Sequence, residues 1–137
     1  MMTTRIDWVD QQQKTLLFQL ICVWTWDDFY IGLDSVWDII AQRDSEINLI
    51  IDFSPSNTFP SGALINAYRA TLRNPSNVGD IVIVTESRFP HCVFQTLKRV
   101  SPWLVPSGNS IIHFASTLQE SLQLLTSPRL VPAAVLQ

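Results

Sequence analysis

The stretch Ile47-Asn-Leu-Ile-Ile-Asp-Phe53 decides the fold. It is rich in β-branched residues and almost wholly apolar, which predicts a strand buried on both faces. Strands of this kind are typical of parallel sheets that helices cover on both sides. Residues 54–60 follow it with two prolines and several small polar residues. This turn-rich composition predicts a loop directly after the strand.

Two strands and a helix are predicted before this stretch. The strands are Ile6–Asp10 and Thr15–Trp24, and the polar break between them indicates an antiparallel hairpin. The second strand is apolar on most of both faces, as expected of a central strand. Thr25, followed three residues later by Asp28, is a variant capping box and opens a helix that runs to about Arg43.

Helices and strands alternate in the rest of the chain. Because such alternation produces parallel strands joined by right-handed crossovers, we expect one mixed five-stranded sheet. The predicted class is α/β, with four helices and the order ββαβαβαβα. The later elements are a helix over Ser61–Asn74, a strand over Ile81–Thr85, a helix from Ser87, a strand over Ile111–Ala115, and a helix that begins at the capping box Thr117–Glu120 with Leu118, Leu122 and Leu125 turned inward.

Composition indicates one folded domain over residues 1–137. Hydrophobic residues make up 47% of the 137 residues and charged residues 15%, which excludes a disordered chain. We place the core at about 6–126 and treat 127–137 as an apolar C-terminal tail. That tail packs either on the body of the domain or on a second subunit, and a homodimer is compatible with either.

Charge and targeting signals narrow the partners and the compartment. The net charge of −3 argues against a general nucleic-acid binder. The longest apolar runs are far shorter than the roughly 20 residues of a membrane span. Free thiols and the lack of an export signal in Met1–Asp10 indicate the cytoplasm.

Polar residues gather where the predicted parallel strands end, the usual place for ligands in such sheets. They include Asp52, Ser54, Ser56, Asn57 and Ser61. Asp and Ser at these positions suit a ligand or a metal, but turns and helix caps use the same residue types. We favour the turn interpretation.

Catalytic and cofactor motifs are lacking. His91 and Cys92 are adjacent in a predicted helix and so do not face each other. His113 stands alone in a predicted strand, and neither a dinucleotide fingerprint nor a P-loop is present. We expect no metal and no cofactor, and we predict that the chain is not an enzyme.

The tryptophans and one pair of arginines leave alternatives open. Five tryptophans indicate either core packing or an aromatic pocket or interface, with Trp26 and Trp103 expected to be the exposed ones. Arg69 and Arg73 lie one turn apart on the second predicted helix. They form either a basic face for an acidic partner or an ordinary solvated face.

The ordered set of elements resembles the STAS domain (sulfate transporter and anti-sigma factor antagonist) in its SpoIIAA-like form. The resemblance spans roughly residues 6–126 and is closest to stand-alone bacterial members. It rests on the strand Asn48-Leu-Ile-Ile-Asp52, on Pro60-Ser61-Gly62 with the helix that follows, and on the closing stretch Phe114-Ala-Ser-Thr-Leu-Gln-Glu-Ser-Leu122.

The resemblance also carries a departure. In the family's anti-sigma factor antagonists the loop before the second helix commonly reads Asp-Ser-Ser-Gly, and a partner kinase phosphorylates the first Ser. Here Phe59 stands in place of that Asp and Pro60 in place of the phosphoserine, while Ser61 and Gly62 are kept. Proline cannot accept phosphate, so Pro60 does not provide the usual phosphorylation switch. Ser61 remains as a weaker candidate for phosphorylation.

Members of this family are generally non-enzymatic and bind proteins or small ligands through that loop and the second helix. The resemblance therefore implies a regulatory, protein-binding domain with a kinase-like partner or a second copy of itself. The implied contact residues include Phe59, Gly62, Tyr68 and Arg69. Two alternatives remain. One is a lipid or nucleotide-like ligand in a Trp-lined pocket under residues 54–61; the other is phosphoryl chemistry at Asp52 with Ser54 or Ser61.

Overall fold

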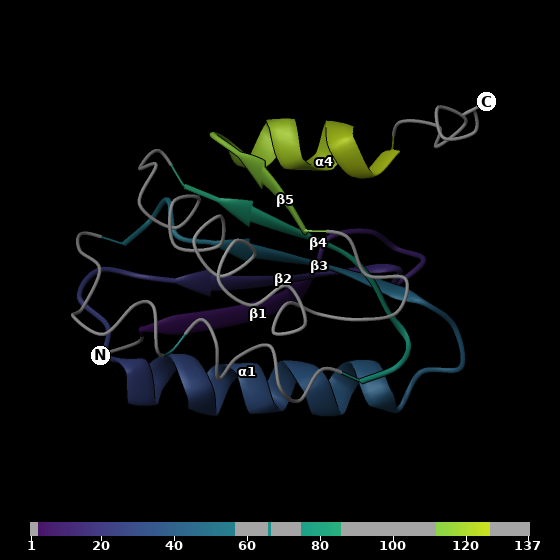
Figure 1. Ribbon diagram of the computed structural model, residues 1–137, viewed down its shortest axis with the longest axis horizontal. Coiled ribbons are helices and arrows are strands. Elements are labelled where there is room, and N and C mark those ends of the chain that lie inside the picture. The colour runs from purple at the N-terminus through teal and green to yellow at the C-terminus, as the bar shows by residue number, and fades with distance from the viewer. Residues whose placement is uncertain (1–2, 57–65, 67–74, 86–111, 127–137) are drawn as a thin grey trace, which may run out of the picture.

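Figure 1 shows the fold as a sheet with helices on its two sides. The computed structural model describes residues 3–56, 66, 75–85 and 112–126. The elements, labelled as in Figure 1, are β1 (Thr4–Trp8), β2 (Thr15–Leu20), α1 (Trp26–Ala41), β3 (Ile47–Asp52), β4 (Val78–Val84), β5 (Ile112–Ala115) and α4 (Leu118–Thr126).

The sheet is mixed, and its strands follow the order of the chain, β1-β2-β3-β4-β5. β1 pairs antiparallel with β2, and each later pair of neighbours is parallel. This confirms the predicted hairpin, the central position of the second strand and the parallel arrangement that follows.

Each face of the sheet has its own apolar core. On one face, Leu16, Phe18 and Leu20 of β2 are buried against α1. On the other, Ile50, Val82 and Val84 are buried beneath α4. β3 contributes Leu49 and Ile51 to the first core and Ile50 to the second, which explains why its sequence is apolar on both faces.

The helices contact these cores with the predicted residues. Phe29, Leu33, Val36, Trp37 and Ile40 of α1 are buried at helical spacing. Leu118, Leu122 and Leu125 of α4 pack against the second core, as their spacing predicts. No helix in the described ranges is long and apolar enough to cross a membrane.

The start of α1 is held by the predicted capping box. The Asp28 N–H donates to Thr25 Oγ1 at 3.1 Å, and the Thr25 N–H donates to Asp28 Oδ2 at 2.9 Å. The hydrogen bond from the Thr25 backbone lowers the pKa of Asp28. At α4 the box is altered, because Thr117 Oγ1 accepts from the Glu120 N–H while Glu120 Oε1 accepts from the Ser116 N–H.

The first hairpin differs from the prediction at three strand ends. β1 begins and ends two residues earlier than expected, because Asp10 belongs to the turn and its Oδ1 accepts the N–H groups of Lys14 and Thr15. β2 ends at Leu20 rather than at Trp24. The reason is Cys22, whose φ of +56° lies in the left-handed region and turns the chain away.

β4 begins at Val78, three residues before the predicted start. The extra residues join the sheet through Asn48, whose Oδ1 accepts the Asp80 N–H at 2.9 Å. A register shift between Ile47 and Leu49 accommodates this contact. Gly79 permits it, because a Cβ at this position would lie 2.4 Å from Asn48 Oδ1.

The two middle helices of the prediction cannot be compared in the same way. The helix over Ser61–Asn74 lies outside the described residues except for Asn66, which is helical. The helix from Ser87 lies wholly outside them. The described residues therefore establish an α/β fold with a mixed five-stranded sheet and one helix on each of its faces.

Candidate functional site

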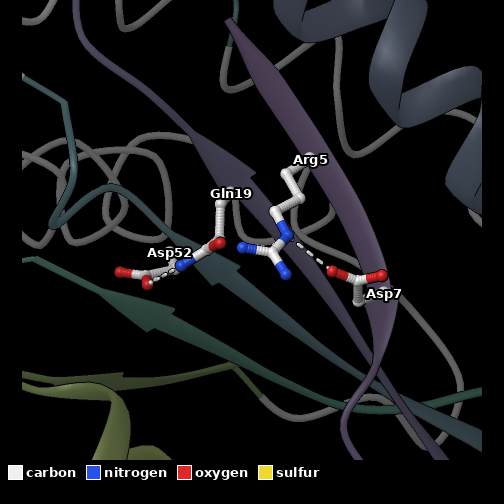
Figure 2. Close-up of polar contacts among 4 residues, drawn as sticks. All are labelled: Arg5, Asp7, Gln19 and Asp52. Carbon is white, nitrogen blue, oxygen red and sulfur yellow. Dashed lines mark hydrogen bonds and ion pairs between the residues drawn. The ribbon is translucent and has the colours of Figure 1, made fainter. Parts of the chain in front are cut away.

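The candidate site lies at the carboxyl end of β3, where Asp52 is buried with 1% of its surface exposed. The parallel register places Gln19 of β2 directly beside it. Gln19 Nε2 donates to Asp52 Oδ2 at 2.9 Å (Figure 2). The neighbouring strand therefore supplies a donor to one carboxyl oxygen.

Ser54 donates two hydrogen bonds to the other carboxyl oxygen of Asp52. Its N–H donates to Asp52 Oδ1 at 2.9 Å and its hydroxyl donates to the same oxygen at 2.6 Å. A side chain that accepts the N–H two residues later forms an Asx turn, which bends the chain as it leaves β3. Asp52 thus determines the direction in which the following loop begins.

Ser56 continues the same turn and joins it to the segment that follows β2. Its N–H donates to the Phe53 C=O at 2.9 Å, and it forms an isolated bridge with Cys22. The Cys22 N–H donates to the Pro55 C=O at 3.0 Å. The structure therefore brings three of the predicted site residues together at the root of one loop: Asp52, Ser54 and Ser56.

Aromatic rings anchor this root from the α1 side. Trp24 is 1% exposed and lies 5.6 Å from the Phe53 ring, between centroids. Trp26 stands edge-on to Trp24 at 4.8 Å and to Phe29 at 5.4 Å. These contacts leave Trp26 half-buried, whereas Trp24 and Trp37 are buried. Trp103, the other tryptophan expected to be exposed, lies outside the described residues.

Tyr30 ties α1 to the segment that follows the loop. Its hydroxyl lies 2.9 Å from the Asn66 C=O and 2.8 Å from Asn66 Oδ1, within hydrogen-bonding distance of both. Asn66 lies in the stretch predicted as the second helix. Residues 54–56 therefore contact the segment after β2, and Asn66 contacts α1.

The chemistry of this site is that of a structural turn. Internal donors reach both oxygens of Asp52, as in the turn interpretation of the sequence. Within the described ranges, no three His, Cys, Asp or Glu side chains lie close enough together to hold a metal ion. The other predicted contact residues lie outside the described residues: Asn57, Phe59, Pro60, Ser61, Gly62, Tyr68 and Arg69.

Sequence reasoning missed a second polar pair, Asp80 and His113. Asp80 is buried on the α4 face of β4, and its Oδ2 lies 3.6 Å from His113 Nε2. The register pairs His113 with Val82, two residues from Asp80 on the same face. The predicted strand begins at Ile81 and does not include Asp80, so the alternation that places Asp80 and Val82 on one face lies outside the prediction.

Comparison with protein-family models, curated proteins and solved structures finds no match for this chain.

Proposed function

We propose that this chain is a non-catalytic, SpoIIAA-like regulatory domain that binds a protein partner through the loop after Asp52 and the helix that follows it. The observation that carries the proposal is the set of hydrogen bonds that the Asp52 carboxyl accepts. Both its oxygens accept hydrogen bonds from Gln19 and Ser54, which gives the loop a fixed starting direction. A fixed root lowers the entropy lost when a loop binds a partner.

The sheet supports the same proposal. An antiparallel hairpin leads into parallel strands in chain order, with α1 on one face and α4 on the other. A mixed sheet that begins with an antiparallel hairpin and continues in parallel strands is compatible with the STAS-like fold that the sequence resemblance implies. Fold alone does not assign function, so the proposal depends on the loop and not on the sheet.

The test is partner retention by loop variants of the full chain. We expect native mass spectrometry of protein purified from its own cells to detect a bound protein with the wild type. Gly62→Arg should lose that partner, because a long charged side chain would stand in the contact surface. Gln42→Arg introduces the same charged side chain at an exposed position at the end of α1, and this control variant should retain the partner.

Two outcomes would contradict the proposal. The first is a wild-type protein that carries no protein partner under conditions that preserve complexes. The second is a Gly62→Arg variant that retains every partner of the wild type. Thermal unfolding of both variants distinguishes a lost contact from a lost fold. A small molecule bound in place of a protein would favour the alternative of a ligand-binding domain.

A further inference from the structure

The outer edge of β1 presents backbone hydrogen-bonding groups. β1 is the end strand of the sheet, and in the described part of the chain β2 alone pairs with it. The bond from the Val9 N–H to the Thr15 C=O fixes the phase of this antiparallel ladder. The backbone N–H and C=O groups of the odd-numbered residues of β1 point toward β2. Those of the even-numbered residues Thr4, Ile6 and Trp8 therefore point outward, away from the sheet.

Two opposite charges lie on this edge strand. Arg5 and Asp7 are exposed on the sheet face away from α1, and Arg5 Nε lies 2.6 Å from Asp7 Oδ2 (Figure 2). They stand symmetrically on either side of Ile6. Edge strands are often protected by charge that repels a second copy. A pair of opposite charges with this symmetry is instead complementary to itself.

We propose that two copies of this chain associate by antiparallel pairing of their β1 strands about a twofold axis at Ile6. Ile6 then lies opposite Ile6 of the partner subunit, and Thr4 lies opposite Trp8 of the partner subunit. These outward-facing residues exchange backbone hydrogen bonds in pairs. The two five-stranded sheets become one continuous sheet, and the interface is isologous.

The charges select this register. With the axis at Ile6, Arg5 lies opposite Asp7 of the partner subunit on one face, and the symmetric pair lies beside it. The four charges then alternate in sign. Moving the axis to Arg5 or to Asp7 would place like charges directly opposite each other, which is unfavourable. The register is therefore specified by side chains as well as by the backbone.

The position of α1 fits the same pairing. Gly32 of α1 lies over Phe18 of β2 and Thr4 of β1. The twofold axis at Ile6 places the two α1 helices on the same face of the continuous sheet, on either side of the new strand pair. By helical periodicity Gly32, Ser35 and Ile39 share the flank toward this edge. Gly32 and Ser35 are small, and Ile39 is half-buried in the single chain.

Charge exchange on the purified full chain tests the pairing. Sedimentation equilibrium should detect a wild-type dimer whose population rises with concentration. Arg5→Asp and Asp7→Arg should each weaken the dimer at least about tenfold, because each places like charges opposite each other twice. An equimolar mixture of the two variants should dimerise again, as should the variant that carries both changes.

The proposal fails if the wild type is monomeric at every concentration. It also fails if both single variants dimerise as well as the wild type, because another surface, such as the 127–137 tail, then makes the contact. A mixture of the two variants that stays monomeric overturns the register. Circular dichroism of each variant confirms that the fold is kept. The measurement needs no other protein, so its result is independent of the proposed function.

Discussion

At the scale of single residues, Asp52 is the most consequential polar side chain of the described region. It is almost completely buried, yet three hydrogen bonds reach its carboxyl group from Gln19 and Ser54. A buried polar group is tolerated when its partners are present and costly when they are removed. Removing Asp52 therefore leaves the donors of Gln19 and Ser54 without this acceptor, and removing those donors leaves the Asp52 carboxyl without its partners.

Replacement of Asp52 should separate the structural role from a catalytic one. Asp52→Ala removes the acceptor for Gln19 Nε2 and for both donors of Ser54, and should lower the free energy of unfolding by about 2–3 kcal/mol. Asp52→Asn keeps the shape and one acceptor oxygen, so its loss should be about 1 kcal/mol or less. Urea unfolding of both variants measures this difference. Equal stability of Asp52→Ala and the wild type would contradict the structural role.

At the scale of elements, the contact between α1 and β2 depends on a glycine. A Cβ on Gly32 would lie 2.5 Å from Phe18 Cε1, and the Phe18 ring is fully buried. α1 can approach the sheet this closely only because position 32 has no side chain. The glycine weakens the helix intrinsically, and the close packing offsets that cost.

Gly32→Ala should therefore destabilise the protein although alanine is the better helix former. We expect a net loss of about 1–2 kcal/mol, since overpacking of a core outweighs the gain in helix propensity. Asp34→Ala, at an exposed position of the same helix outside the flank of Gly32, should not lower the free energy of unfolding. Phe18→Leu makes room for the new methyl group, so the double variant should lose less than the two single losses together. Additive losses would argue against the contact.

The capping box of α1 predicts a pH-dependent contribution to stability. The Thr25 N–H lowers the pKa of Asp28 in the folded chain, so the ionised form stabilises the fold. This contribution is complete above the unfolded pKa of Asp28 and disappears as the pH falls through its lower folded pKa. In thermal unfolding, Asp28→Asn should be less stable than the wild type at neutral pH, and this difference in stability should disappear in acid.

Thr25→Ala provides the matched control for this titration. Thr25→Ala removes a hydroxyl acceptor that does not titrate in this range. Most of its loss of stability relative to the wild type should therefore persist in acid. An Asp28→Asn deficit that stayed constant from neutral to acid pH would show that the carboxylate charge contributes nothing.

At the scale of the whole molecule, periodicity predicted the parts of the fold that simple burial determines. Ile47–Asp52 is apolar on both faces because each face meets its own core, and Leu118, Leu122 and Leu125 lie where helical spacing places them. The directions of the strands were also predicted, the antiparallel hairpin from the polar break and the later parallel strands from the alternation of helices and strands. Their order across the sheet was not predicted and comes from the structure.

The remaining features depend on contacts that no local pattern contains. Cys22 takes a left-handed φ because the chain must turn to meet Ser56, far away in the sequence. Asp80 lies within β4 because Asn48 of the neighbouring strand accepts its N–H and Val78 pairs with Ile47 of that strand. For the candidate site, the sequence identified Asp52, Ser54 and Ser56, but not Gln19, whose role arises from the pairing of β2 with β3.

The strand order has a consequence for synthesis of the chain. Every strand pairs with the one made just before it, from β1 through β5. The sheet can therefore grow from one edge in the order of translation, without keeping a gap open for a later strand. Pairing between strands that are neighbours in the sequence limits the loop that each step must close. α4, which packs over β3, β4 and β5, can cover their apolar face only after all three have formed.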